Sequence, residues 1–184
     1  MSICALDIET TGLQLPNKAV GTADEILQLA IVAEDNSVLF DELFKPEHKS
    51  SWKEAQRCNR ITPEMVENAP GFRDRVSDIQ RILNCHKVVV FYNAEFDLAF
   101  LTNQGLHLEQ GKPFCMLKAF SQYRTGGAAT KRGQRRYSLA HCASYLRIKV
   151  DKYHDALSDA QTTMTCYKAL CRRLGLSSPC YRDA

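Results

Sequence analysis

The chain has 184 residues, 45 % of them hydrophobic and 24 % charged, with a formal net charge of +3 at pH 7, values that are ordinary for one globular domain. No apolar run approaches the ~20 residues of a membrane helix, and the amino terminus lacks the basic and then apolar layout of a signal peptide. We therefore expect a soluble cytoplasmic protein with one domain over residues 1–176 and a short tail over residues 177–184.

The first element is an apolar segment over residues 3–12, whose composition predicts a buried strand that ends at Thr11 and Gly12. Asp7 and Glu9 lie two residues apart in it, and because side chains alternate along a strand, both carboxylates leave it on the same face. Two carboxylates beside an apolar strand are costly unless a positive charge lies between them. A hard divalent cation with oxygen ligands is the expected partner, and the rest of the chain should supply further ligands.

The next part of the chain predicts a strand pair and two helices. Residues 25–32 and 37–44 predict two strands joined by a turn over residues 34–36, without a definite register. Residues 46–59 are polar and predict no defined element. Residues 62–70 predict a short helix that begins with a threonine N-cap followed by proline. A longer helix follows, with apolar residues at three- and four-residue spacing: Phe72, Val76, Ile79 and Leu83.

A strand and a helix carry the next acidic residue. Residues 87–92 are a β-branched run typical of a central parallel strand, and the helix that follows begins at Asn93 and stops near Gly105. Asp97 lies in the first turn of this helix, beyond the carboxyl end of the strand, where open α/β sheets bind their ligands. An acidic residue in a first helical turn is also a common partner of the helix dipole, so Asp97 alone does not indicate a site.

The last part of the chain predicts three more helices. Residues 114–123 predict a strand end that runs into a helix, residues 138–146 a serine-capped helix, and residues 155–174 the last helix, which Gly175 stops. Its apolar stripe consists of Leu157, Ala160, Met164, Tyr167, Cys171 and Leu174. Asp159 borders this stripe and is expected to be partly buried. His154 precedes the helix, where by itself it would be a polar loop residue that caps the helix.

One loop concentrates positive charge. Between residues 124 and 137 the chain has no acidic residue and five basic ones: Arg124, Lys131, Arg132, Arg135 and Arg136. Such a loop would bind the phosphate groups of a nucleic acid in a salt-dependent way. A solvated surface loop without a ligand fits the same residues, so the composition leaves both interpretations open.

The cysteines indicate neither a zinc site nor a disulfide framework. They are spread along the chain without a C-x-x-C pair, at Cys4, Cys58, Cys85, Cys115, Cys142, Cys166, Cys171 and Cys180. Most lie within apolar patterns, where a free thiol behaves as a small hydrophobic group. We expect free thiols in a reducing compartment.

Three motifs taken together resemble the DEDDh exonucleases of the DnaQ-like family. These are D-I-E-T-T-G at residues 7–12, Y-N-A-E-F-D at residues 92–97 and H-D-A-L-S-D-A at residues 154–160. The segment over residues 59–70 is similar to the exonuclease X-type members. The resemblance covers nearly the whole chain and implies an α/β fold: a ribonuclease H-like mixed five-stranded sheet flanked by helices. Tyr92 departs from the pattern, because members usually have histidine there.

The resemblance implies a two-metal-ion site. Asp7, Glu9, Asp97 and Asp159 would hold two Mg²⁺ or Mn²⁺ ions, Asp7 contacting both, Glu9 and Asp159 the ion that binds the attacking water, and Asp97 the other. Two cations ~4 Å apart stabilise the attacking and leaving oxygens of an in-line displacement at phosphorus. His154 would be the general base, a role that suits a side chain with an unperturbed pKa of ~6.5.

Further residues are expected to contact the substrate. Two match positions that line the terminal nucleotide in relatives, two lie in the second motif, and two belong to the basic loop: Thr10, Leu13, Asn93, Phe96, Arg135 and Arg136.

The resemblance implies a 3′→5′ exonuclease of the proofreading and repair type that releases nucleoside 5′-monophosphates. The expected partner is a nucleic acid with a free 3′ end, with DNA favoured over RNA. An exoribonuclease of the same fold stays open, because the metal ligands act on phosphate and not on the sugar. A catalytically silent nucleic-acid-binding or polymerase-accessory module is the alternative of another class, and association with a polymerase or as a homodimer is left open.

Overall fold

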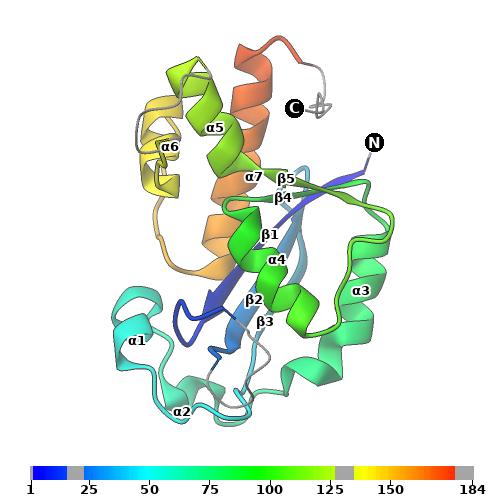
Figure 1. Cartoon of the computed structure of the whole chain (residues 1–184), viewed down its shortest axis with the longest axis vertical. Helices are drawn as coiled ribbons and strands as arrows, with labels where there is room; N and C mark the ends of the chain where they lie inside the picture. Colours follow the sequence, from blue (N-terminus) through cyan, green and yellow to red (C-terminus); the bar gives the residue numbers. More distant parts are fainter. Residues whose placement is uncertain (1, 16–22, 127–134, 177–184) are drawn as a thin grey trace.

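The computed structural model describes residues 2–15, 23–126 and 135–176. These residues form a mixed five-stranded sheet flanked by helices (Figure 1), which confirms the predicted α/β, ribonuclease H-like fold. The strands are β1 (Ile3–Thr10), β2 (Ile26–Ala33), β3 (Val38–Leu43), β4 (Val88–Phe91) and β5 (Lys112–Cys115).

The strand with the first acidic pair lies at the centre of the sheet, whose order is β3-β2-β1-β4-β5. β1 pairs antiparallel with β2, with Glu9 opposite Gln28, and parallel with β4, with Ile3 opposite Val88. β2 and β3 are antiparallel, whereas β4 and β5 are parallel. Because both faces of this centre are covered, β1 and β2 are nearly continuous apolar runs. Asp7 and Glu9 therefore sit at the end of the most buried part of the sheet.

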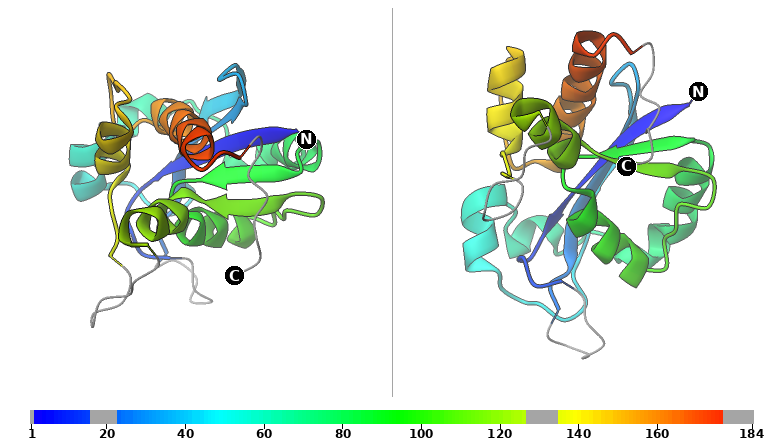
Figure 2. Two further views of the ribbon diagram at one scale, coloured as in Figure 1. Left: turned by 90° about the horizontal axis from the view of Figure 1, so that it is seen from above. Right: turned by 45° about the horizontal axis from the view of Figure 1, so that its top comes forward.

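Helices cover both faces of the sheet. They are α1 (Lys53–Asn59), α2 (Pro63–Val66), α3 (Val76–Asn84), α4 (Ala94–Asn103), α5 (Met116–Thr125), α6 (Leu139–Leu146) and α7 (Ala156–Arg173), with a 3-10 turn η1 (Phe72–Arg75) before α3. The longest helix, α7, crosses β1 and β2, and α4 packs against β4 and β5 on the opposite face (Figure 2). The main hydrophobic core lies between these layers and includes Leu6, Ile31 and Met164.

The serine cap predicted for α6 is confirmed, whereas the N-cap of α7 is Asp155 and not His154. Oγ of Ser138 accepts a hydrogen bond from the backbone N–H of His141 at 3.2 Å, and α6 begins at the next residue. Oδ1 of Asp155 accepts from the backbone N–H of Ser158 at 3.1 Å and caps α7. Both helix starts lie within one residue of their predicted positions, and the second sets the direction in which α7 enters the sheet.

Two details of the sequence prediction were wrong. The polar segment over residues 46–59 contains α1, which has little apolar periodicity because Asn59 is its one buried residue, and which ends in a left-handed Arg60 where glycine would be the usual signal. The apolar stripe of α7 ends at Cys171, because the helix stops at Arg173 and Leu174 is 49 % exposed.

The free-thiol prediction holds for the described part of the chain, where all seven cysteines are unpaired. Cys180, the predicted tail over residues 177–184 and the basic-loop residues Lys131 and Arg132 lie outside the described residues. Among the helices of the described residues, none is long and apolar enough to cross a membrane.

Candidate active site

Four acidic side chains from three elements converge at one end of β1. Asp7 and Glu9 come from the strand itself, Asp97 from the first turn of α4, and Asp159 from the first turn of α7. Asp97 and Asp159 are only 4 % and 8 % exposed. The carboxyl-terminal half of β1, the start of α4 and the start of α7 thus bring the three sequence motifs together.

Ionisation of Asp7 is opposed by burial and by the charges of the other three acids. Burial raises the pKa of Asp7 well above its ordinary value, and the negative charges of Asp97, Asp159 and Glu9 raise it further. Three other carboxylates that all act on one carboxyl group define a compact anionic cluster. Asp7 is its central member.

The other three carboxyl groups are shifted in the same direction. Burial, assisted by the charge of Asp159, raises the pKa of Glu9 to about 7. Burial also raises the pKa of Asp97 to about 8, against an opposing hydrogen bond from the backbone N–H of Ile8. For Asp159, burial raises the pKa to about 6, although the backbone N–H of His154 opposes the shift. The site is therefore an unfavourable place for four free carboxylates.

His154 lies at the mouth of the cluster. One ligand atom each from Glu9, His154 and Asp159 lie within 4.8 Å of one another, and the histidine is exposed. The backbone N–H of His154 donates to Oδ2 of Asp159 at 3.1 Å. This bond ties the turn before α7 to the first turn of the helix, and His154 itself has a left-handed conformation with φ of 60°.

The donor set fits divalent cations. Oδ1 of Asp159 is buried and has no hydrogen-bond partner within the described residues, so it is available as a ligand. All four acids offer hard oxygen atoms of the kind that Mg²⁺ and Mn²⁺ bind. A bound cation would also offset the burial and the repulsion between negative charges that raise the pKa values of these groups.

Two buried amide side chains, for which the sequence predicted no role, position the cluster. Nδ2 of Asn59 donates to the carbonyl of Thr10 at 3.1 Å, and a side-chain hydrogen bond from Asn59 lowers the pKa of Glu9. Gln28 donates from Nε2 to Oδ1 of Asp41 at 2.9 Å and accepts from the backbone N–H of Ala156 at 3.1 Å. A glutamine inside an apolar strand was the available sequence signal for Gln28.

The loop after β1 is braced by one carboxylate. Oδ1 of Asp24 accepts from Oγ1 of Thr11 and Oδ2 accepts from the backbone N–H of Gln14, both at 2.8 Å. A Cβ atom at Gly12 would collide with the same carboxylate, which explains the glycine. The loop leaves Leu13 84 % exposed. Oγ1 of Thr10 donates to the carbonyl of Gly12 at 2.6 Å, so this predicted substrate contact is engaged in the loop.

The remaining substrate-binding candidates lie around the start of α4. Asn93 is the N-cap residue of α4, and its Oδ1 accepts from Nη2 of Arg136 at 3.1 Å. Phe96 packs on Phe100, with ring centroids 4.9 Å apart. The guanidinium of Arg135 lies over the ring of Tyr137 at 5.3 Å. Asn93 and Arg136 are thus brought together, one helical turn from Asp97.

The sequence is similar to those of known exonucleases. The family model RNase T, described as exonuclease, matches residues 4–167. The chain is 29 % identical over 174 residues to the DNA polymerase III subunit epsilon of Treponema pallidum (strain Nichols), a match that covers 92 % of this chain and 76 % of that protein.

Solved structures share the fold at lower identity. Exonuclease X in complex with 5′ overhanging duplex DNA has a TM-score of 0.65 and 21 % identity, with 96 % of this chain and 95 % of that chain covered. Exonuclease I of E. coli in complex with a dA16 oligonucleotide has a TM-score of 0.73 and 17 % identity, with 95 % and 41 % covered. A 3′-exonuclease that recognises a histone mRNA stem-loop has a TM-score of 0.69 and 14 % identity, with 96 % and 65 % covered. Because the family model matches most of the sequence, the chain belongs to the RNase T exonuclease family, the DnaQ-like exonucleases with a ribonuclease H-like fold.

Proposed function

We propose that the protein is a metal-dependent 3′→5′ exonuclease that hydrolyses the terminal phosphodiester bond of DNA and releases nucleoside 5′-monophosphates. The observation that carries this proposal is the cluster of four buried or half-buried carboxylates with His154 at its mouth. Membership of the exonuclease family supports the reaction class. The similarity to a DNA polymerase subunit and to exonucleases solved with DNA supports DNA as the substrate.

The four carboxylates would hold two Mg²⁺ or Mn²⁺ ions. When bound, such ions supply the positive charge that stabilises the attacking and leaving oxygens of the displacement. Asp7 is the member whose pKa responds to all three of the others, which suits a ligand shared between both ions. Glu9 and Asp159 lie on the His154 side of the cluster, and Asp97 enters it from α4 on the opposite face of the sheet.

His154 would act as the general base. Its imidazole is exposed beside the carboxylate oxygens of Glu9 and Asp159, so the ring can reach a water molecule at the cluster mouth. A neutral imidazole nitrogen accepts the proton from this water as its oxygen attacks phosphorus. The hydrogen bond from the His154 backbone to Asp159 fixes the base relative to the carboxylates.

The loop after β1 and the start of α4 would hold the terminal nucleotide. Leu13 offers an exposed apolar side chain, and Asp24 braces the loop that presents it. Asn93 and Phe96 stand on the other side of the cluster, before and within the first turn of α4. We place the 3′-terminal sugar and base between these two walls.

A labelled-oligonucleotide assay tests the proposal. One DNA and one RNA strand of the same sequence, each labelled at the 5′ end, are incubated with Mg²⁺ or with EDTA, using the wild type and His154→Ala. The proposal predicts a ladder that shortens from the 3′ end, that requires the metal and that is at least about 100-fold slower in the variant. Absence of cleavage of either strand with metal present would overturn the enzyme assignment and leave a binding module.

An exoribonuclease is the second candidate. The similarity to the 3′-exonuclease that recognises a histone mRNA stem-loop favours it, and the carboxylate cluster acts on phosphate in either polymer. The same assay separates the two candidates through the ratio of kcat/KM values for DNA and RNA. A ratio above about 10 in favour of RNA would select the ribonuclease.

A role beside a polymerase is a further proposal. The Treponema pallidum relative is named as a subunit of DNA polymerase III, which supports proofreading as the process and a polymerase as the partner. Size-exclusion chromatography of the protein alone distinguishes a monomer from a homodimer. Co-elution with the replicative polymerase subunit of the organism that encodes this protein tests the association.

A further inference from the structure

We propose that a pocket between α4 and α5 binds one phosphate group of the substrate strand, upstream of the bond that is cut. The site takes a phosphodiester group of a nucleic acid. This inference rests on the proposed exonuclease function, because it assumes that a strand leads away from the carboxylate cluster. It adds two residues, Lys118 and Ser121, that the catalytic site does not use.

The pocket is a defined cavity beside the catalytic cluster. It has a volume of about 130 Å³, and its polar lining consists of Asn93, Glu95, Lys118, Ser121, Arg135 and Arg136. A water molecule occupies ~30 Å³ of liquid volume, so the pocket holds about four water-sized groups, which is the scale of a phosphate group. The start of α5 lies above the start of α4 at this place (Figure 1).

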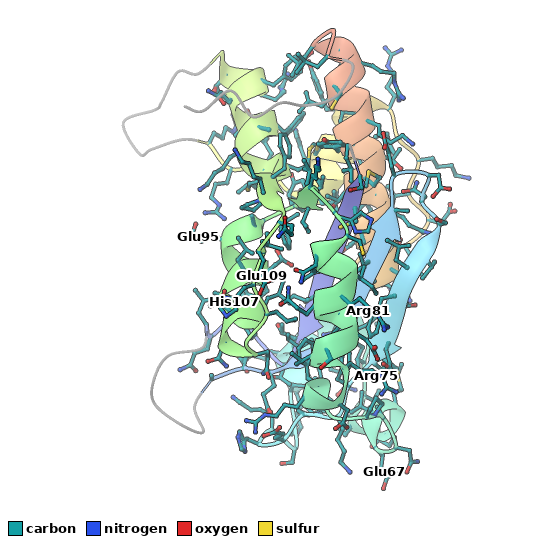
Figure 3. All side chains as sticks on the ribbon, turned by 90° about the vertical axis from the view of Figure 1, so that its right-hand side faces the viewer. Glu67, Arg75, Arg81, Glu95, His107 and Glu109 are labelled. Carbon is teal, nitrogen blue, oxygen red and sulfur yellow. The ribbon has the colours of Figure 1, made fainter. Side chains whose placement is uncertain are left out.

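The charge of the lining favours an anion. Lys118, Arg135 and Arg136 contribute three cations, and within the described residues none of them forms an ion pair with an acidic side chain. Glu95 is the acidic residue of the lining, and it is exposed and extends outward from the first turn of α4 (Figure 3). Guanidinium and ammonium groups that lack acidic partners are the usual ligands of phosphate oxygens.

Ser121 supplies an independent indication of a ligand. The residue is 2 % exposed, and its Oγ has no hydrogen-bond partner within the described residues. A buried hydroxyl without a partner is unfavourable, so native proteins rarely leave one. Ser121 follows Lys118 by three residues on α5, which places both side chains on one face of the helix, toward the pocket. A phosphate oxygen above this face would accept a hydrogen bond from the hydroxyl.

The pocket is held in a fixed position relative to the catalytic acids. The backbone N–H of Leu117 donates to the carbonyl of Tyr92 at 2.8 Å, which ties the start of α5 to the end of β4. Arg136 donates to Asn93, whose own helix carries Asp97 in its first turn. A strand whose terminal nucleotide lies at the carboxylates would pass this pocket as it leaves the site. The pocket would therefore fix the strand and not the reacting phosphate.

The test compares a long substrate with one that has no upstream phosphate. The long substrate is a 5′-labelled single-stranded DNA, and the short one is the p-nitrophenyl ester of thymidine 5′-monophosphate, in which nitrophenol replaces the rest of the strand. The variants are Lys118→Ala and Ser121→Ala. The control is Lys112→Ala, because Lys112 is an exposed lysine at the end of β5 that is farther from α5. All three variants should keep the wild-type thermal midpoint within about 2 °C, since both lysines are exposed and Ser121→Ala removes only a hydroxyl group without a partner in the described residues.

We expect KM for the DNA to rise about three- to tenfold in both pocket variants, with kcat unchanged, because the lost contact is equal in ground and transition states. The kinetics of the nitrophenyl ester should stay at wild-type values. For Lys118→Ala, the slope of log KM against log salt should fall by ~0.7, the value for one phosphate contact on a single strand. The Lys112→Ala control should match the wild type throughout.

If KM and the salt slope for DNA are unchanged in both variants, the pocket does not bind a phosphate of the strand. An equal rise of KM for the nitrophenyl ester would contradict the proposal as well. Failure of the proposed function looks different, because the wild type would then hydrolyse neither substrate. In that case the dissociation constant of the labelled DNA, measured by fluorescence polarisation in EDTA, shows whether the pocket binds the strand. A value equal to wild type in Lys118→Ala and Ser121→Ala would contradict it.

Discussion

The backbone N–H of His154 donates to Oδ2 of Asp159 at 3.1 Å, so the proposed general base and one proposed metal ligand are joined directly. The bond spans five residues, from the turn before α7 into the first turn of the helix. It accompanies a left-handed backbone at His154, with φ of 60°, which is an uncommon conformation for a residue with a side chain. The proposed base is thus held by main-chain structure, while its side chain is exposed at the mouth of the cluster.

Substitution of His154 should separate catalysis from stability. Both His154→Ala and His154→Gly should lower kcat about 10²- to 10⁴-fold, because each removes the proton acceptor. Glycine adopts a positive φ more readily than alanine does, so the free energy of unfolding of His154→Gly should exceed that of His154→Ala by about 1 kcal/mol. Urea titration and single-turnover kinetics measure the two effects. Equal kcat values for the alanine variant and the wild type would show that His154 is not the base.

Removal of one charge from the cluster should stabilise the metal-free protein. Asp7→Asn removes the central carboxyl group, whose pKa is raised by burial and by Asp97, Asp159 and Glu9, so the thermal midpoint in metal-stripped buffer should rise. Mg²⁺ or Mn²⁺ should raise the midpoint of the wild type and have a much smaller effect on the variant. Differential scanning calorimetry with and without about 5 mM metal measures the effect. This concentration is about tenfold above the dissociation constant of a typical weak site. A variant that melts below the metal-free wild type would speak against a repulsive cluster.

The metal-free protein should lose stability as pH rises. The folded-state pKa values of about 6 for Asp159, about 7 for Glu9 and about 8 for Asp97 lie above the unfolded values of about 4. Between these limits the folded state binds more protons than the unfolded state, so the contribution of these groups is largest at low pH. It declines between about pH 4 and pH 8 and is constant above that range.

Urea midpoints in metal-stripped buffer from pH 5 to pH 9 measure this slope. Asp97→Asn is the matched variant, because Asp97 has the highest pKa of these three groups, so its removal should flatten the upper part of the curve. Saturating Mg²⁺ should flatten the curve of the wild type as well. If the wild type and Asp97→Asn have parallel curves between pH 6 and pH 8, Asp97 does not titrate in this range.

Gln28 should act on catalysis through the start of α7. Gln28→Leu leaves the backbone N–H of Ala156 without its acceptor and Asp41 without a donor, which should lower the free energy of unfolding by about 2 kcal/mol. Because Ala156 follows the base by two residues, kcat should fall more than KM rises. Gln110→Leu, at an exposed loop position, is the control. A stability loss with kcat intact would confine Gln28 to a structural role.

The positions of the four acids on their strand and helices were predictable, because each one coincides with a strong local signal. The acids of β1 follow an apolar run, Asp97 follows a β-branched strand, and Asp159 borders the stripe of a long amphipathic helix. The carboxyl end of a strand and the first turns of two helices are positions that the sequence itself marks. The structure therefore brings these residues together where the pattern predicted them.

The parts that escaped prediction depend on tertiary contacts. α1 carries one buried residue, Asn59, which is held by bonds to Thr10 and Ile61 that only the folded chain creates. The stripe of α7 continues in sequence to Leu174, but the helix ends before it. The pocket at Ser121 joins two helices and the end of the basic loop, and no local pattern encodes such a junction.

The position of the metal ions tests the central claim most directly. Crystals grown with Mn²⁺ and thymidine 5′-monophosphate would show the ions by anomalous scattering. The proposed mechanism predicts two peaks enclosed by the carboxylates of Asp7, Glu9, Asp97 and Asp159, with Asp7 bound to both and the imidazole of His154 facing the one on the Asp159 side. Absence of any peak in the cluster at saturating Mn²⁺, in a folded crystal with the nucleotide bound, would contradict the assignment of this site.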